Sequence, residues 1–261
     1  MQSIKKKNLI SLLEYVKPSE VNLSSFIIQP ELNPKVWLTE DLLYPEIREQ
    51  LINIANDFFK FLDIDWVEIK DILFTGSLAN YNWSNFSDID VHLIISYEDV
   101  NEDIELVKDY LKVKKDLWGK EHNLKIKGYD VELYAQDENE KHASTGVYSI
   151  QDEKWILKPT QEKPEIDKLT IKKKSSELMN KIDEIVSDYK KEKYQDVLDA
   201  YDVLWKKIKK MRQAGLDKSG EFSSENLIFK VLRRTNYIEK LTNLHLKAYD
   251  KLNSIDESEK I

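Results

Sequence analysis

The stretch SDIDVHLII, residues 87–95, restricts the fold of this chain more than any other part of its sequence. Side chains alternate along a β-strand, so Ile89 and Val91 share one face of the strand. Asp88 and Asp90 share the opposite face. A pair of carboxylates is rarely buried without a compensating cation. The stretch therefore predicts a strand with one apolar face, packed on a core, and one acidic face that binds a cation or faces solvent.

Periodicity in the first part of the chain predicts a mixed sheet accompanied by helices. Apolar residues follow Pro45 at helical spacing through Leu62, and a second helical pattern covers residues 101–119. The segments with strand character are 67–76, 87–97, two short runs on either side of Gly128, and a hairpin that pairs 148–150 with 155–157. This order of elements predicts an α+β or mixed α/β fold.

A change of composition at residues 160–166 predicts a domain boundary, because the stretch KPTQEKPE carries prolines among several charges. The chain beyond it has helical periodicity. A long apolar stripe that includes Trp205 is predicted to be core and to end at Gly215, and Ser223 or Ser224 is predicted to cap the next helix. The expected organisation is an N-terminal arm of residues 1–40, an α+β domain of 41–162 and a helical domain of 163–261.

Composition narrows the possible functions. The 261 residues include no cysteine, which excludes disulfides, thiolate catalysis and cysteine-ligated zinc and favours the cytoplasm. The chain has neither an apolar run of roughly 18 residues nor a signal-peptide pattern, so no membrane association is expected. A formal net charge of −8 predicts no strong general binding of nucleic acid, although a local basic patch is compatible with it.

A Gly-Ser pair precedes the acidic strand. Gly76 ends the predicted strand 67–76, and Ser77 begins the stretch SLANYNW, which can form a short helix. The N-terminus of a helix presents free amide groups to an anion, Ser77 adds a hydroxyl, and Gly76 allows a phosphate to approach closely. Ser87, at the entry to the next strand, is a further candidate for nucleotide binding, although its position also suits a structural role.

Asp88 lies eleven residues after Ser77, and Asp90 follows on the same strand face. Two carboxylates about 7 Å apart along a strand can converge on a pair of divalent cations. Mg²⁺ is the favoured ion, because it prefers oxygen ligands and is usually completed by substrate phosphates. A phosphate cradle followed by a metal-binding pair predicts phosphoryl or nucleotidyl transfer.

These residues resemble the signature of the DNA polymerase β-like nucleotidyltransferase superfamily. The resemblance is carried by Gly76, Ser77, Asp88 and Asp90 and covers roughly residues 45–160. It implies a small mixed-sheet nucleotidyltransferase core followed by an all-helical domain. The segment TGSLANYNWSNFSDIDVH, together with VELYAQD and GEFSSENLIFKVLRR, resembles sequences of uncharacterised nucleotidyltransferase-domain proteins of large tailed phages. For a phage-encoded chain, the cytoplasm expected above would be that of the host.

The family pattern also asks for a third carboxylate, on a later adjacent strand. Asp130 and Glu132 share one face of the predicted strand in GYDVELYAQ and both fit. Glu132 is favoured because it lies deeper in the strand, while Asp130 is next to the turn at Gly128; both stay open as metal ligands. The resemblance implies that Asp88, Asp90 and the third acid are the catalytic residues.

The same resemblance implies a mechanism in which Mg²⁺ (or Mn²⁺) ions bridge the acidic residues and a nucleoside triphosphate, with ATP as the expected donor. Asp90 and the third acid would hold the ion that activates an acceptor hydroxyl. This hydroxyl attacks the α-phosphorus, and pyrophosphate leaves. The acceptor could be a protein side chain, an RNA 3′ end, a small molecule or a second nucleotide.

Other residues are candidates for the nucleotide pocket. Tyr148, in TGVYS, follows the second acidic strand and could stack on a base, although an aromatic residue at this position also suits core or hairpin packing. Lys230, Arg233 and Arg234 form a basic cluster on a predicted helix, which is either a solvated helix face or, as the resemblance implies, a contact with the triphosphate. His92 shares the face of the acidic pair, either as a structural residue or as a partner of a carboxylate or ligand.

Two alternatives to a nucleotidyltransferase with a separate acceptor stay open. One is a synthase of an oligonucleotide second messenger, which would form product without added acceptor. The other is a catalytically silent module that binds nucleotide or is a component of a phage particle. The intact acidic pair, Asp88 and Asp90, favours an active enzyme.

Overall fold

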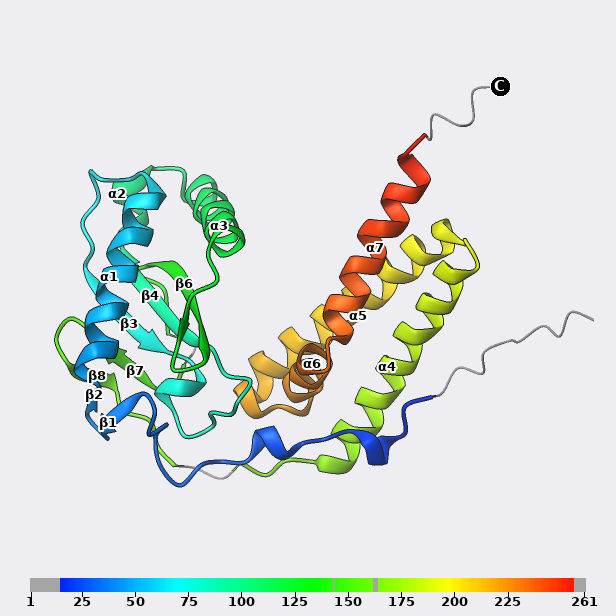
Figure 1. Ribbon diagram of the computed structural model, residues 1–261, viewed down its shortest axis with the longest axis horizontal. Helices are drawn as coiled ribbons and strands as arrows, with labels where there is room; N and C mark the ends of the chain where they lie inside the picture. The colour runs from blue at the N-terminus through cyan, green and yellow to red at the C-terminus, as the bar shows by residue number, and fades with distance from the viewer. Residues whose placement is uncertain (1–14, 143, 162–163, 256–261) are drawn as a thin grey trace, which may run out of the picture. The chain divides into compact units, whose positions relative to one another are not determined.

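The structure is a computed structural model that describes residues 15–142, 144–161 and 164–255. The described residues divide into two compact units, whose elements are labelled in Figure 1. The α+β unit is the described part of Ser24–Lys163, and the helical unit comprises the described parts of Met1–Leu23 and Pro164–Ile261. The protein is α+β, as the sequence predicts, with a mixed sheet and several helices.

The α+β unit contains a six-stranded sheet in the order β5-β6-β4-β3-β7-β8. Strands β4 and β6 run parallel, and the other neighbouring pairs in this sheet are antiparallel. Its strands are β3 (Asp71–Thr75), β4 (Ile89–Ile95), β5 (Lys125–Ile126), β6 (Tyr129–Asp137), β7 (Val147–Ser149) and β8 (Lys154–Leu157). The unit also contains a two-stranded sheet of β1 (Trp37–Thr39) and β2 (Leu42–Leu43), the 3₁₀ turns η2 (Ser24–Phe26) and η3 (Ser77–Ala79), and the helices α1 (Pro45–Leu62), α2 (Tyr97–Val100) and α3 (Ile104–Glu121).

The elements predicted from periodicity are present in this unit. Helix α1 begins at Pro45 and ends before Asp63, whose left-handed backbone (φ 58°) directs its amide to the carbonyl of Lys60. The acidic stretch forms β4, and the predicted hairpin is formed by β7 and β8. These elements could be predicted because each is specified by its own pattern of apolar and polar residues.

The sheet has one face packed on helices. Side chains that alternate along the strands, such as Phe74, Val91 and Leu133, join residues of α1 and α3 in one apolar core. Figure 1 shows α1 in front of the strands β3 and β4. The other face carries Asp90, as expected from the alternation in the acidic stretch.

Residues 24–40 belong to the α+β unit, whereas the sequence assigned them to an arm. Trp37 is buried and stacks on Trp155, with 4.7 Å between the ring centroids. Asn33 is buried nearby, and its Nδ2 donates to the hydroxyl of Tyr129 at 2.7 Å. These partners lie about a hundred residues away along the chain, so local periodicity gives no sign of them.

The helical unit contains four long or medium helices in the described part of the chain. They are α4 (Lys168–Lys190), α5 (Tyr194–Ser219), α6 (Ser224–Arg234) and α7 (Tyr237–Asn253), accompanied by the 3₁₀ turns η1 (Pro18–Glu20) and η4 (Gly220–Phe222). Ser223 is the N-cap of α6, and its hydroxyl accepts from the amide of Asn226. Among the described residues, no helix has the length and apolar character needed to cross a membrane.

The prediction that α5 ends at Gly215 is wrong. The helix continues to Ser219, and Gly220, with φ 68°, follows its last turn. Gly215 is buried where α5 meets the start of α6, and a Cβ at this position would lie 2.6 Å from Cβ of Glu225. Gly215 therefore allows two helices to pack closely. In the sequence alone, such a glycine cannot be distinguished from one that ends a helix.

Residues 15–23, also assigned to the arm, pack against α4. The side chain of Asn180 accepts from the amide of Val16 at 2.7 Å and donates to its carbonyl at 3.1 Å. This pair of hydrogen bonds satisfies the backbone of Val16 much as a neighbouring strand would. The rest of the predicted arm, residues 1–14, lies outside the described residues.

Two helical glycines give a test of this packing. At Gly119 in α3, a Cβ would meet no atom within 4 Å, so Gly119→Ala should raise the free energy of unfolding by about 0.5–1 kcal/mol through helix propensity. At Gly215, Gly215→Ala should lower it by about 1–3 kcal/mol through overpacking. Denaturant unfolding followed by circular dichroism measures both. Stabilisation by Gly215→Ala would contradict the close contact between α5 and Glu225.

Candidate functional site

Strand register brings the predicted acids onto one face of the sheet. Asp90 on β4 is the Cα partner of Glu132 on the parallel strand β6. On its other side, Asp90 is the partner of Thr75 at the end of β3. Neighbouring strands lie about 4.8 Å apart, so Asp90 stands between these two residues on the face opposite the core. Asp88 directly precedes β4 and is partly buried.

The Gly76 turn lies against the carboxylate of Asp90. Gly76 has φ 76° and ψ −163°, a conformation that essentially only glycine adopts. A Cβ at Gly76 would lie 1.9 Å from Oδ2 of Asp90 and 2.8 Å from its Cγ. Any other residue at this position would therefore displace the carboxylate. The glycine of the Gly-Ser pair is required by the acid that follows it fourteen residues later.

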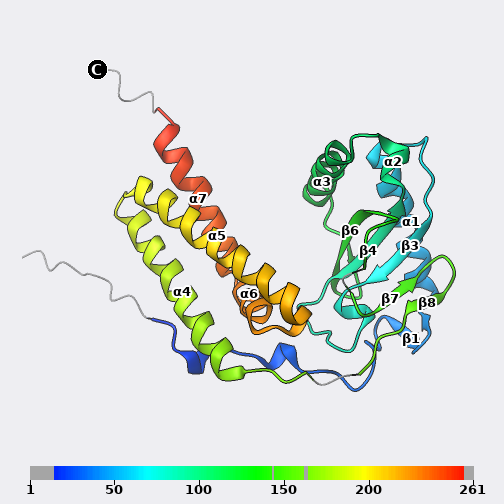
Figure 2. The same ribbon diagram turned by 180° about the vertical axis from the view of Figure 1, so that it is seen from behind.

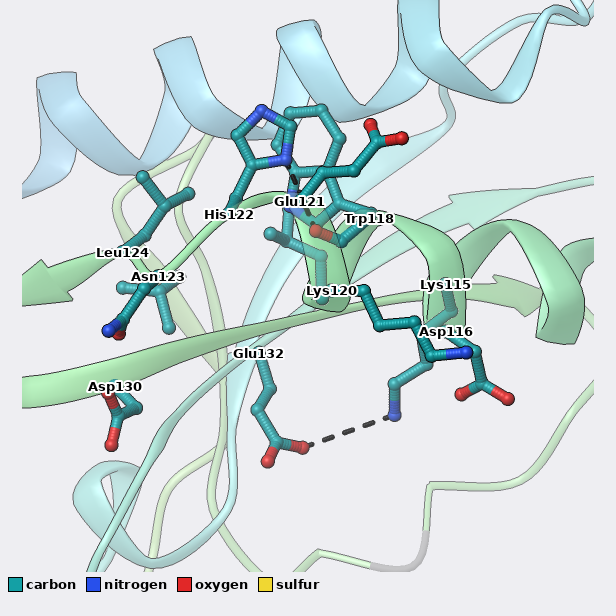
Figure 3. A pocket seen from close by; sticks show the side chains of 13 residues that line it. Lys115, Asp116, Trp118, Lys120, Glu121, His122, Asn123, Leu124, Asp130 and Glu132 are labelled. Carbon is teal, nitrogen blue, oxygen red and sulfur yellow. Dashed lines mark hydrogen bonds and ion pairs between the residues drawn. The ribbon is translucent and has the colours of Figure 1, made fainter. Parts of the chain in front are cut away.

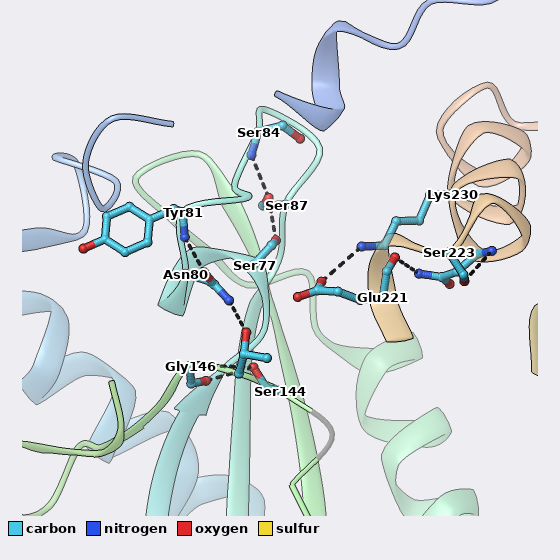
Figure 4. Close-up of polar contacts among 12 residues, drawn as sticks. Ser77, Asn80, Tyr81, Ser84, Ser87, Ser144, Gly146, Glu221, Ser223 and Lys230 are labelled. Atoms are coloured by element: carbon cyan, nitrogen blue, oxygen red, sulfur yellow. Dashed lines mark hydrogen bonds and ion pairs between the residues drawn. The ribbon is translucent and has the colours of Figure 1, made fainter. Parts of the chain in front are cut away.

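Two serine hydroxyls connect this turn to the loop before β4. Ser77 Oγ donates to Ser87 Oγ at 2.7 Å, and Ser87 Oγ also accepts from the amide of Ser84 at 2.9 Å (Figure 4). The helix expected over SLANYNW is only the three-residue 3₁₀ turn Ser77–Ala79. The candidate phosphate site is therefore the Gly76–Ser77 turn and its hydroxyls, without the amide array of a longer helix. Ser87 has a clear structural role in shaping this turn.

The two candidates for the third acid differ in their surroundings. Glu132 is level with Asp90 and is 51% exposed, and its Oε2 lies 4.0 Å from Nζ of Lys115. Asp130 lies one side-chain repeat earlier on β6 and is paired with Lys125 across the β5–β6 hairpin. The register thus places Glu132, rather than Asp130, beside the acid of β4.

Both acids line a pocket beside the last turns of α3, shown in Figure 3. Its volume is about 680 Å³. The pocket is bounded by charged side chains of α3, including Lys115, and by the ring of Trp118, which stacks on His122 at 3.9 Å. A concave site of this size is large enough for a small ligand.

The described residues contain no group of three or more acidic or histidine side chains arranged to hold a metal ion. In this structure the carboxylate of Glu132 points toward the ammonium group of Lys115 (Figure 3). The Glu132 side chain is long and half exposed. A change of rotamer would therefore let its carboxylate leave Lys115 and contact a metal ion. The donor atoms of Asp88, Asp90 and Glu132 are all carboxylate oxygens, the ligands that Mg²⁺ prefers.

His92, one side-chain repeat beyond Asp90, is part of a polar network across three strands. Its Nδ1 donates to Oε1 of Gln136 on β6 at 2.7 Å, and its Nε2 lies 3.3 Å from the hydroxyl of Thr75 on β3. Burial lowers the pKa of the imidazole, and the nearby Lys115 acts in the same direction. His92 thus connects β3, β4 and β6 through its two ring nitrogens. Thr75 and Gln136 were missed as its partners, because strand register cannot be read from one sequence.

Tyr148 is a core residue in this structure. The side chain is fully buried in the core, where it makes edge contacts with Trp37 (5.0 Å) and Trp155 (5.1 Å). Its hydroxyl donates to the carbonyl of Asp41 at 3.0 Å, and burial raises its pKa to about 12. The expectation that Tyr148 stacks on a base is therefore corrected: alternation along β7 points it to the core face.

The predicted basic residues Lys230 and Arg233 lie on α6, in the helical unit. Lys230 is largely buried (22% exposed) and its Nζ lies 3.6 Å from Glu221 (Figure 4). Burial lowers the pKa of Lys230, and the positive charges of Arg233 and Arg234 add to this effect. The carboxylate of Glu221 acts in the opposite direction and offsets part of the cost of burying Lys230 beside two arginines.

Arg212 of α5 joins this basic cluster. Its guanidinium lies over the ring of Phe229 at 4.2 Å, and its Nε donates to Asn226 Oδ1 at 3.2 Å. Burial lowers its pKa, with a further contribution from the charge of Arg233. Arg212 could not be assigned to this cluster from the sequence, because it belongs to a different helix from the other cations.

Comparison of the chain with protein-family models, with curated proteins and with solved structures finds no match in any of the three. The resemblance to polymerase β-like nucleotidyltransferases therefore stays a prediction, based on the residues quoted above.

The contact between Gly76 and Asp90 can be tested with a double-mutant cycle. Gly76→Ala should lower the free energy of unfolding by about 1–3 kcal/mol, because the new Cβ adopts a disfavoured conformation and collides with the carboxylate. In an Asp90→Ala background the collision is removed, so the loss should be smaller by about 0.5–3 kcal/mol. Urea unfolding of the four proteins measures the coupling. Additive losses would show that Asp90 does not lie against the turn.

Proposed function

We propose that the protein is a metal-dependent nucleotidyltransferase, which transfers a nucleoside monophosphate from a nucleoside triphosphate to an acceptor hydroxyl and releases pyrophosphate. ATP is the expected donor, and the cytoplasm supplies it together with Mg²⁺. The observation that carries the proposal is the arrangement of Asp90. Its carboxylate lies against the Gly76–Ser77 turn on one side, and its strand partner on the other side is Glu132.

The acids have the chemistry needed to hold divalent cations. Asp88 and Asp90 would hold the ions that accompany the triphosphate, and Glu132 would complete the site by leaving Lys115. When bound, the ions supply charge neutralisation at the phosphates and a more acidic acceptor hydroxyl. Because the acids hold the ions and the acceptor hydroxyl is the nucleophile, the site needs carboxylates and a glycine turn but no nucleophilic side chain.

The remaining residues of the site position the substrate. The Gly76–Ser77 turn exposes backbone and a hydroxyl where a phosphate can approach without meeting a Cβ. Ser87 fixes the Ser77 hydroxyl by the bond between them. In-line geometry between the acceptor oxygen and the leaving pyrophosphate is the main requirement of this reaction, and a rigid turn next to the acids favours it.

The helical unit has a basic cluster, formed by Arg212, Lys230, Arg233 and Arg234, with the charge to bind phosphate groups. Arg233 contributes to lowering the pKa of both Arg212 and Lys230, as expected for cations that lie close together in the helical unit. That Lys230 and Arg233 bind nucleotide stays a prediction, which the resemblance alone carries.

Transfer can be tested with each α-³²P-labelled nucleoside triphosphate and Mg²⁺ against protein, RNA, small-molecule and no acceptor. Wild-type protein should give labelled product and pyrophosphate, and the Asp88→Asn/Asp90→Asn variant should fall to less than about 1% of that rate. The matched control is Asp57→Asn/Glu68→Gln, which removes two exposed carboxylates outside the site and should leave the rate unchanged.

The outcomes separate the alternatives. Product without added acceptor would favour a second-messenger synthase. Nucleotide binding without product under any condition would favour a catalytically silent module. Absence of both binding and product, in a folded protein, would refute the proposal.

The choice between the two candidates for the third acid gives a further prediction. Glu132→Gln should reduce the rate of transfer by roughly a hundredfold or more, because it removes a charge beside Asp90. Asp130→Asn should change it less than about threefold, because this carboxylate is exposed and paired with Lys125. Initial rates at saturating triphosphate measure both effects. The reverse order would assign the role to Asp130.

A further inference from the structure

One face of helix α5 carries a concentration of positive charge that the proposed site does not use. We call it the α5 basic face and define it by Trp205, Lys206, Lys209 and Lys210. These residues, with Asp202 and Gln213, line a surface groove of about 690 Å³. The face belongs to the helical unit, and α5 runs beside α7 in both Figure 1 and Figure 2.

The charge of this face contrasts with that of the chain. The sequence WKKIKKMR, residues 205–212, contains five cations and no acid, in a chain whose formal net charge is −8. In the part of the chain that the structure describes, Lys206, Lys209 and Lys210 form no ion pair with a carboxylate. By comparison, Lys60 and Lys108 on α1 and α3 each contact an acid one turn away.

Aromatic rings accompany the lysines. Trp205 is only partly buried, although the stripe to which it belongs is core at Leu204 and Ile208. Lys209 Nζ lies 5.4 Å from the centroid of the Trp205 ring. Tyr201 stacks on Trp205, at 6.1 Å, and on His245 of α7, at 4.0 Å.

We propose that the α5 basic face binds single-stranded nucleic acid. Lysines that lack carboxylate partners attract phosphates, and accessible aromatic rings stack on unpaired bases. A helix face with both lysines and aromatic rings is complementary to a nucleic-acid single strand, which presents phosphates and unpaired bases side by side. A duplex presents phosphates but hides the faces of its bases, and an acidic peptide presents charge without rings.

The extent of the face limits the interaction to a short segment. Three lysines neutralise about three phosphates, so the affinity should fall roughly 20-fold between about 50 and 200 mM salt. The acidic remainder of the chain disfavours a longer footprint, in agreement with the absence of general nucleic-acid binding expected from composition.

The test is fluorescence anisotropy with labelled oligo(U) and oligo(dT) of about 15 nucleotides, and with a duplex of the same length. It is done with EDTA and without nucleoside triphosphate, so that its result is independent of nucleotidyl transfer. Wild-type protein should bind at least one single strand more tightly than the duplex, with the salt dependence given above. The comparison of oligo(U) with oligo(dT) shows whether RNA or DNA is preferred.

Charge reversal tests the location. Lys206→Glu/Lys209→Glu/Lys210→Glu should weaken binding at least tenfold, as expected for loss of about three phosphate contacts. The matched control is Lys172→Glu/Lys173→Glu/Lys174→Glu, which makes the same change of charge on α4 and should weaken binding less than about threefold. Circular dichroism confirms that both variants are folded. Equal loss in the two variants would overturn the assignment to α5.

Ring substitution tests the stacking. Trp205→Leu should weaken binding on the order of tenfold, whereas Trp205→Phe, which keeps a ring, should restore most of it. If neither variant differs from wild type and heparin competes as well as the single strand, the face binds polyanions through charge alone and the proposal fails. Absence of binding at low salt, or equal binding of poly-glutamate, would also refute it.

Discussion

The fit of the Asp90 carboxylate against the backbone of Gly76 is the constraint on which the rest of the site depends. The contact leaves no room for a side chain at Gly76, and it requires a backbone conformation that glycine alone adopts easily. It also fixes the pairing of β3 with β4, since Thr75 must stand opposite Asp90. A shift of one residue would turn every side chain of β4 to the other face and bury both aspartates.

The sheet separates two incompatible requirements. Its covered face supplies the apolar contacts that stabilise the α+β unit, with Phe74, Val91 and Leu133 among them. Its opposite face carries Asp90 and the hydrogen-bonded network around His92, where charge is tolerated. Because side chains alternate strictly along a strand, one short sequence can meet both needs without a loop between core and site.

The parts of the fold that could be predicted are those specified locally. Pro45 and the apolar spacing after it define α1, and alternation around Asp88 and Asp90 defines β4. The parts that could not be predicted depend on partners far along the chain. Trp37 meets Trp155, and Gly215 meets Glu225 across a helix junction. Among the candidate site residues, the burial of Tyr148 depends on its packing against Trp37, far away along the chain, and a three-residue strand has too short a pattern to show which of its faces is buried.

Net charge is a weak guide to what such a protein binds. Charges in water are screened beyond about 8–10 Å at physiological salt, so each surface acts through its own few residues. The carboxylates on the sheet belong to the α+β unit, whereas the cations around Lys230 and the α5 basic face belong to the helical unit of the same acidic chain. An acidic total is compatible with sites for metal ions and for phosphates together, because cation sites need clustered carboxylates while phosphate sites need only a few lysines and arginines close together. The formal net charge of −8 mainly describes the solvated surface, and it does not give the sign of the charge at any one site.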